Sequence, residues 1–231
     1  MTKSRVKAVL WRLFFAGSAA AALATWHWQS RWGATAAEQR RSLPGDQLVP
    51  QPNLQATRAV GIAAPPSAVW PWLVQLGQDK GGFYSYDWLE RAFGLPVVNA
   101  DVVEPEWQRL EVGDPVTLGE RVALRVAVIE PGQALVLEGD PAGTTRRMEF
   151  EFSWSFVLEP EGPTGSRLVV RERYMWTKWR VGAFIKTVSW VSFVMSRAML
   201  LGLRSRAERS WQTEVDQAAE AAVRRAEESA A

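Results

Sequence analysis

The chain has no cysteine, and this absence excludes several kinds of chemistry at once. Without a thiol there is no disulfide, no thiolate nucleophile, no CxxC redox pair and no cysteine-ligated metal site. Histidine is almost absent too, because the single one, His27, lies in an apolar segment near the N-terminus. A histidine-based triad and a multi-histidine metal site are therefore excluded from the globular part of the chain. We expect no metal and no cofactor.

Excess charge of one sign is also missing. The 27 lysines and arginines are nearly balanced by 25 aspartates and glutamates, which leaves a formal net charge of +2. No basic run with interleaved aromatic residues resembles a nucleic-acid groove, so we expect no nucleic-acid partner. What the chain has in excess is tryptophan, with 13 residues. Such an excess fits an aromatic-lined pocket, a membrane-interface belt, or both.

The N-terminus has the pattern of a membrane anchor. Basic residues at positions 3, 5 and 7 precede an uncharged run at 13–28. A transmembrane helix needs about 20 apolar residues, and Arg12 can snorkel to the interface and lengthen the span. Trp26, Trp28 and Trp32 would form the distal aromatic belt. We therefore expect residues 1–32 to be an anchor with its N-terminus in the cytoplasm and the remaining chain outside.

A cleaved signal peptide is the competing interpretation of the same segment. Ala22-Leu23-Ala24 satisfies the small-residue pattern of a cleavage site, and the basic and apolar regions precede it in the expected order. The protein would then be secreted. The interfacial tryptophans favour the anchor, and either outcome exports the domain.

The remaining chain divides into a polar tether or surface strap at 33–53, a domain at 54–209 and a charged helical tail at 210–231. Within the domain, the pattern predicts a strand at 54–62, a helix at 67–76, a glycine-aromatic loop at 77–85 and a short helix at 87–93. Further strands follow at 116–118, 123–130, 133–139, 147–158 and 167–177, and a long helix starts at about 182. Because the connections between these strands are short, the sheet should be antiparallel.

Two strands carry the clearest alternation. One phase of the first strand is aromatic, which predicts an aromatic inner face: Phe150, Phe152, Trp154 and Phe156. The other phase contains Ser153 and Ser155, which predicts an outer face exposed to water. On the outer face we expect the arginines at 171 and 173 to pair with the glutamates at 149 and 151. On the inner face of the partner strand lie the residues at 172, 174 and 176.

Four sequence segments in order carry a resemblance to a known family: LPGDQLVP at 43–50, VWPWLVQLGQ at 69–78, GGFYSYDWLE at 81–90 and PEWQRLEVGD at 105–114. With the order of the elements, they resemble membrane-anchored bacterial proteins of the SRPBCC superfamily, which includes START lipid-transfer domains and polyketide cyclases. The resemblance covers about residues 31–208. It implies an α+β helix-grip fold, in which a curved antiparallel sheet wraps around a long C-terminal helix and encloses a cavity for hydrophobic ligands. It carries no established catalytic residues to transfer.

The expected function is a membrane-tethered, non-catalytic domain that binds or carries a lipid or another hydrophobic small molecule. Its candidate cavity residues come from the glycine-aromatic loop and the sheet: Phe83, Tyr84, Tyr86, Phe150, Phe152, Trp154, Phe156, Tyr174 and Trp176. The alternative is a polyketide cyclase or dehydratase-like enzyme that uses Glu172 and Tyr174, because burial would raise the pKa of that carboxyl towards neutrality. A buried carboxylate paired with an arginine such as Arg125 or Arg146 remains the structural interpretation.

Overall fold

A single curved sheet organises the molecule. The computed structural model describes residues 24–86, 98–119, 122–139 and 149–230. Its sheet has six antiparallel strands in the order β1-β6-β5-β4-β3-β2, so the first strand pairs with the last. The bounds are β1 (Leu54–Ile62), β2 (Pro115–Gly119), β3 (Val122–Glu130), β4 (Ala134–Gly139), β5 (Glu151–Glu161) and β6 (Gly165–Met175).

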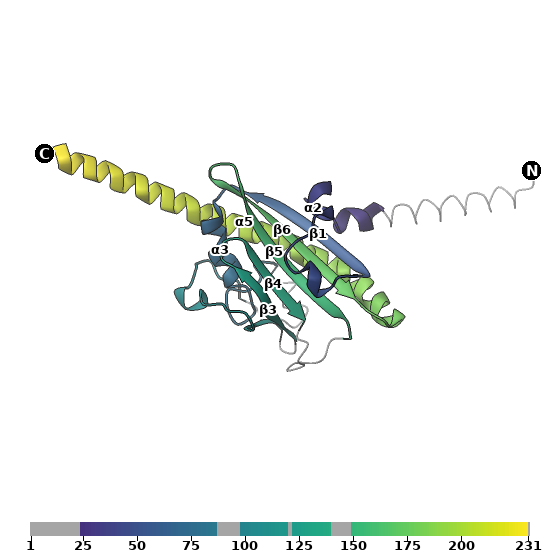
Figure 1. Cartoon of the computed structure of the whole chain (residues 1–231). Helices are drawn as coiled ribbons and strands as arrows, with labels where there is room; N and C mark the ends of the chain where they lie inside the picture. The colour runs from purple at the N-terminus through teal and green to yellow at the C-terminus, as the bar shows by residue number, and fades with distance from the viewer. Residues whose placement is uncertain (1–23, 87–97, 120–121, 140–148, 231) are drawn as a thin grey trace, which may run out of the picture.

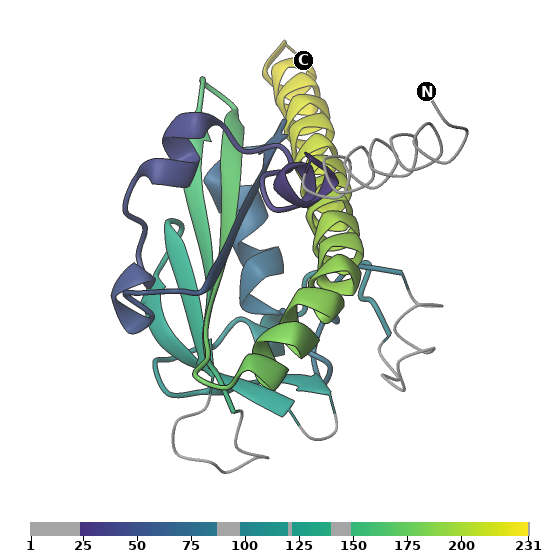
Figure 2. The ribbon, with the colours of Figure 1, turned by 90° about the vertical axis from the view of Figure 1, so that its right-hand side faces the viewer.

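Two helices cover the inner face of this sheet. The short α3 (Pro66–Val74) begins immediately after β1, with a proline in its first turn, and α5 (Trp179–Ala230) follows β6. Figure 2 shows both helices on the same side of the sheet. Four side chains of these helices are fully buried against the inner side chains of the strands: Trp72 and Leu73 of α3, and Leu200 and Leu203 of α5. The predicted α+β helix-grip class is confirmed.

The loop between α3 and the sheet passes very close to α5. At Gly202 an added Cβ would lie only 2.1 Å from the carbonyl oxygen of Tyr84. Tyr84 itself has a positive φ of 55°, a conformation that residues with side chains seldom adopt. The missing side chain at position 202 therefore permits the contact between helix and loop.

A strap lies across the outer face of the sheet. It comprises residues 30–53 and contains α2 (Ala36–Arg40) and the 3-10 turn η1 (Asp46–Leu48). Its Leu43 packs on Ala59, Val157 and Val169, which point outward from three adjacent strands. In Figure 2 the strap and α5 lie on opposite sides of the sheet.

This strap overturns two predictions about the outer face. Ser153 and Ser155 were expected to be wet, but both are buried. Arg171 does not pair with a glutamate across the strands; it binds the Asp46 carboxylate at 2.7 Å and donates to the backbone oxygens of Glu38 and Arg41. Arg173 also binds Asp46, at 2.9 Å. The sequence alternation located the outward phase correctly but could not indicate that a distant segment covers it.

The long helix α5 has two parts with different environments. Up to about Trp211 one side packs in the core, and beyond that residue the helix is almost entirely exposed and projects away from the sheet (Figure 1). Among the described residues, α5 is the helix long and apolar enough to cross a membrane, and 39% of its most apolar stretch is buried.

The predicted anchor lies mainly outside the described residues. Residues 1–23 are not described, and residues 24–29, which are, form a helical turn that ends at the strap. The predicted short helix at 87–93 lies outside the described residues as well.

Candidate functional site

The sheet, the loop after α3 and the first half of α5 enclose a cavity of about 540 Å³. This volume lies in the range of sites for drug-sized molecules. Most of the wall is apolar. It is formed by Phe83, Leu118, Phe152, Trp154, Phe184, Val188, Val191, Met195 and Met199, together with Ser85 and with a group of polar residues from β6 and α5.

The cavity opens beside the first turns of α5. Phe184 is 62% exposed and Val188 is 40% exposed, although both contribute to the wall. The opposite, deeper part of the wall is formed by buried residues such as Met199 and Ser196. A ligand would thus enter between the start of α5 and the sheet.

One buried carboxylate interrupts the apolar wall. Glu172 of β6 points inward and receives four hydrogen-bond donors. Its Oε1 accepts from the Arg58 guanidinium at 2.7 Å and the Ser196 hydroxyl at 2.8 Å, and its Oε2 accepts from the Tyr174 phenol and the Ser192 hydroxyl, both at 3.1 Å. We call these five residues the Glu172 cluster. Four residues of this cluster line the cavity: Glu172, Tyr174, Ser192 and Ser196.

Arg58 supplies the countercharge for this cluster. It lies on β1, and its side chain is only 2% exposed. Its Nε donates to the backbone oxygen of Gln29 and its Nη2 to the Gln29 side chain, while the Phe193 ring lies 5.5 Å from its guanidinium carbon. Because arginine stays charged in proteins, a buried guanidinium needs a buried anion, and Glu172 provides it.

The expected pairing of Glu172 with an arginine is confirmed, but the partner is Arg58 and not Arg125. Arg125 binds Glu138 at 2.7 Å on the neighbouring strands, and Arg146 lies outside the described residues. Arg58 was missed although it shares the inward phase of Ala56 and Val60. A charged residue in that phase was the available signal, but the pairing of β1 with β6 is needed to bring it to Glu172.

The Tyr174 phenol is held in its protonated form. Burial raises its pKa well above the ordinary value of 10, and the neighbouring Glu172 carboxylate raises it further. The phenol donates its hydrogen to Oε2 of that carboxylate at 3.1 Å. The ring also packs on Phe152, with the centroids 4.7 Å apart.

The nine candidate cavity residues are divided between the cavity and other sites. Phe83, Phe152, Trp154 and Tyr174 line it. Phe156 is fully buried in the core, Phe150 contacts the Tyr174 ring from outside the wall, and Trp176 packs under the first turn of α5. Tyr86 is 41% exposed.

Tyr84 has a structural role instead. Its phenol donates to the backbone oxygen of Trp72 at 3.0 Å, and the Arg206 guanidinium lies 5.0 Å from the ring centre. Burial raises the pKa of this phenol far above its usual range. Tyr84 therefore joins the loop to α3 and α5.

The sequence prediction missed most of the contribution from α5. None of the nine candidate cavity residues named from the sequence lies on that helix. Ser192 and Ser196, four residues apart, lie on the side that faces β6 and place two hydroxyls on one carboxylate. The spacing of the two serines in an apolar stripe was the signal that could have identified them.

No family model matches the chain, and no curated protein matches it. Several solved structures are similar in fold. A hypothetical protein from Helicobacter pylori is 15% identical, with 72% of this chain and 95% of that chain covered and a TM-score of 0.47. The Zhui aromatase/cyclase from Streptomyces is 14% identical, with 68% and 94% covered and a TM-score of 0.40. A protein from Mesorhizobium loti is 16% identical, with 66% and 97% covered and a TM-score of 0.38.

The likeness is one of fold. The SRPBCC-like helix grip rests on the order of the strands and on the placement of α5, which are features of this chain itself. Similarities of this size carry no argument about ligand or activity, so these must come from the cavity.

Proposed function

We propose that this protein is a membrane-tethered binding or carrier domain for a hydrophobic small molecule or lipid, without catalytic activity. The observation that carries the proposal is the cavity of about 540 Å³ with its nearly continuous apolar wall. An apolar ligand placed there would remove its surface and that of the wall from water, which contributes roughly 25 cal/mol per Å². Such a cavity suits a ligand that is poorly soluble in water.

The Glu172 cluster favours binding over catalysis. General acid or base catalysis needs a group that can exchange a proton with the substrate. Glu172 is engaged by four donors and by the charge of Arg58, and the high pKa of Tyr174 makes that phenol a poor acid. The alternative, a cyclase or dehydratase-like enzyme that uses Glu172 and Tyr174, has in its favour only that both residues line the cavity.

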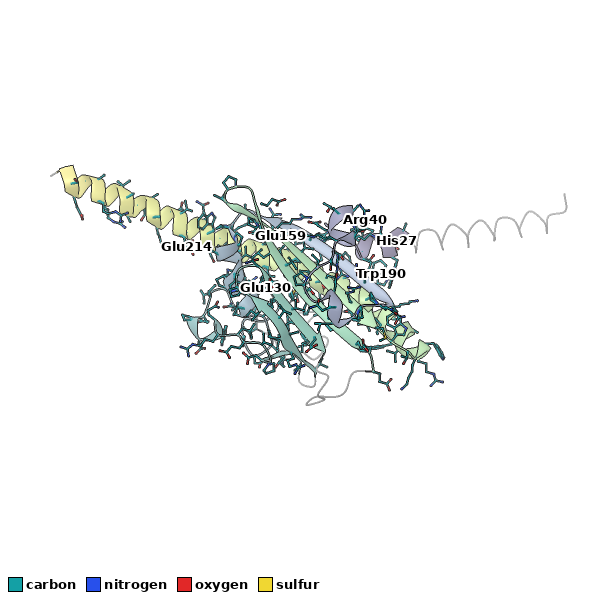
Figure 3. All side chains as sticks on the ribbon, viewed as in Figure 1. His27, Arg40, Glu130, Glu159, Trp190 and Glu214 are labelled. Carbon is teal, nitrogen blue, oxygen red and sulfur yellow. The ribbon has the colours of Figure 1, made fainter. Side chains whose placement is uncertain are left out.

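Membrane tethering is supported by the sequence of residues 1–32 and by the surface where they join the domain. Trp28 packs edge-on against Phe193 of α5, with ring centroids 5.2 Å apart. In Figure 3, His27 and Trp190 lie at the same end of the molecule. The surrounding part of α5 exposes large apolar side chains, namely Trp179, Phe184, Val188, Trp190 and Val194.

This exposed surface of α5 includes the entrance of the cavity. Phe184 and Val188 belong to both. Tryptophans beside basic residues such as Lys186 and Arg180 are typical of a surface in contact with lipid headgroups. A tethered domain in this orientation would exchange its ligand directly with the bilayer.

Photolabelling tests the proposal. Membranes that contain the full chain are incubated with a photoactivatable long-chain hydrocarbon and irradiated, and the labelled peptides are mapped. We expect label on the cavity-lining parts of β5, β6 and α5. Val191→Trp, which fills the cavity, should abolish this label, whereas Val215→Trp, on the exposed C-terminal part of the same helix, should leave it unchanged. Label that is equal in both variants would refute a ligand in the cavity.

A further inference from the structure

The hydrogen bonds of the Glu172 cluster define what kind of polar group the cavity can receive. A carboxylate has two oxygens with about four lone-pair directions in all. In Glu172 each oxygen already accepts two donors, Arg58 and Ser196 on Oε1 and Tyr174 and Ser192 on Oε2. The carboxylate therefore has no free acceptor site for a ligand.

The three hydroxyls of the cluster have the opposite property. Ser192, Ser196 and Tyr174 each have one hydrogen and each donate to Glu172, and Ser192 also lies within hydrogen-bonding reach of the Tyr174 phenol. Their oxygens retain lone pairs, and these three residues line the cavity. Among the described residues, the hydroxyls of the Glu172 cluster thus offer the cavity acceptors, while their hydrogens are engaged by Glu172.

The other donors near the cluster do not change this balance. The Arg58 guanidinium is buried behind Glu172 and is occupied by Gln29. The indole nitrogen of Trp154 has no hydrogen-bond partner among the described residues, but it is buried and presents almost no surface to the cavity, although other atoms of Trp154 form the wall.

From this arrangement we infer that the ligand is an apolar molecule with a neutral hydroxyl group, which donates its hydrogen to the hydroxyl oxygens of Ser192, Ser196 or Tyr174. The inference rests on the proposed binding function and names its ligand class. A ligand whose polar end only accepts, such as an ether, a ketone or a carboxylate, would find no donor there. Burying such an unpaired acceptor costs free energy. A carboxylate would also bring a second negative charge close to Glu172.

Three probes of equal chain length test the inference: 1-decanol, its methyl ether 1-methoxydecane and decanoic acid. Each radiolabelled probe is titrated against the full chain in lipid nanodiscs, and binding to Val191→Trp nanodiscs is subtracted as partition into lipid. We expect 1-decanol to bind about fivefold to tenfold more tightly than the ether, the effect of about one net hydrogen bond. Decanoic acid should bind more weakly than the alcohol.

Two variants test whether the Glu172 cluster causes the preference. In the double variant Arg58→Met/Glu172→Gln the charge pair is removed as a unit, and the amide nitrogen of glutamine donates two hydrogens. The serine and tyrosine hydrogens are then free to turn to the cavity, so the preference for alcohol over ether should disappear. Ser189→Ala is the matched control, because Ser189 is a buried serine of α5 whose hydroxyl donates to the Lys186 backbone oxygen, outside the cavity wall. It should keep the preference.

The outcomes separate this inference from the proposed function. Equal binding of alcohol and ether, or tighter binding of the acid, would overturn the hydroxyl inference and leave the carrier function standing. A preference that survives in the double variant would also overturn it, because the cluster would not be its source. If none of the three probes binds saturably, both the hydroxyl inference and the carrier function are overturned.

Discussion

At the scale of single residues, the pair Arg58 and Glu172 is the most unusual feature of the domain. Two opposite charges lie in an apolar interior, with side chains 2% and 5% exposed. Burying an ion pair costs free energy that its mutual attraction only partly offsets, so the pair is weak evidence for stability. Its importance lies in how it orients the hydroxyls around Glu172.

Removal of one partner should therefore be much worse than removal of both. Arg58→Met leaves an unpaired buried carboxylate and should lower the free energy of unfolding by about 3–5 kcal/mol. Arg58→Met/Glu172→Gln should recover most of this loss. Urea denaturation measures the difference. The control is Arg125→Met, whose partner pair is partly exposed, and it should cost about 1 kcal/mol or less.

A second ion pair makes a pH-dependent contribution to stability. Glu38 of the strap binds Arg167 at 2.7 Å, and this bond, with the Thr35 backbone N–H, lowers the pKa of Glu38 from 4.5 to about 2. Because the folded-state pKa is the lower one, the contribution is fully present above about pH 4.5 and is lost as the pH falls towards 2.

Glu38→Gln should consequently be less stable than the wild type at pH 7, and the gap should close between about pH 4.5 and 2. Thermal unfolding of both proteins over this range measures it. Glu227→Gln, on the exposed end of α5, should match the wild type throughout. A gap that stays constant with pH would mean that the Glu38 carboxylate does not stabilise the strap.

At the scale of elements, the contact of α5 with the glycine-aromatic loop gives a prediction of unusual sign. Replacing a helical glycine by alanine normally stabilises a helix by about 1 kcal/mol. At Gly202 the new methyl group would collide with the Tyr84 carbonyl oxygen, so we expect Gly202→Ala to destabilise the domain by about 1–3 kcal/mol. Chemical denaturation decides the sign, and a stabilised variant would contradict the close contact.

The two parts of α5 should respond differently to truncation. Termination after Gln212 removes exposed helix and should change the free energy of unfolding by less than about 0.5 kcal/mol. Termination after Arg206 also removes the fully buried Ala207 and the partly buried Trp211, which pack on the core, and should destabilise the domain measurably. Similar stability of the two truncated chains would place the end of the core before Ala207.

Sequence patterns predicted the elements better than their environments. The strand expected at 54–62 has those bounds in β1, because Pro65 and Pro66 mark the start of the next helix. The alternation at 147–158 identified the inward phase of β5, including Phe152 and Trp154 of the cavity. Local periodicity contains this information.

The contacts between distant segments could not be predicted in the same way. Arg58 and Glu172 are 114 residues apart and meet only because β1 pairs with β6. The burial of Ser153 and Ser155 depends on a strap whose sequence is polar and rich in proline. The periodicity of side chains within one strand does not indicate which distant segment packs on that strand.

At the scale of the whole molecule, the proposed membrane tether would bring the cavity entrance next to the bilayer. A chain without cysteine allows a direct test of the orientation. A single cysteine introduced by Ser67→Cys, at an exposed position of α3, should react with a membrane-impermeant maleimide in bacterial cells whose inner membrane is intact. Reaction only after lysis would put the domain in the cytoplasm, and soluble protein outside the inner membrane would indicate a cleaved signal peptide.

If the cavity holds a hydrophobic ligand, the protein should carry that ligand in a fixed stoichiometry through purification. The full chain is purified from bacterial membranes in nanodiscs, and the organic extract is quantified by mass spectrometry against extracts of Val191→Trp and of the control Val215→Trp. We expect about one equivalent of a hydroxyl-bearing apolar compound with the wild type and with Val215→Trp, and none above background with Val191→Trp. The same compounds in equal amounts from all three proteins would contradict it.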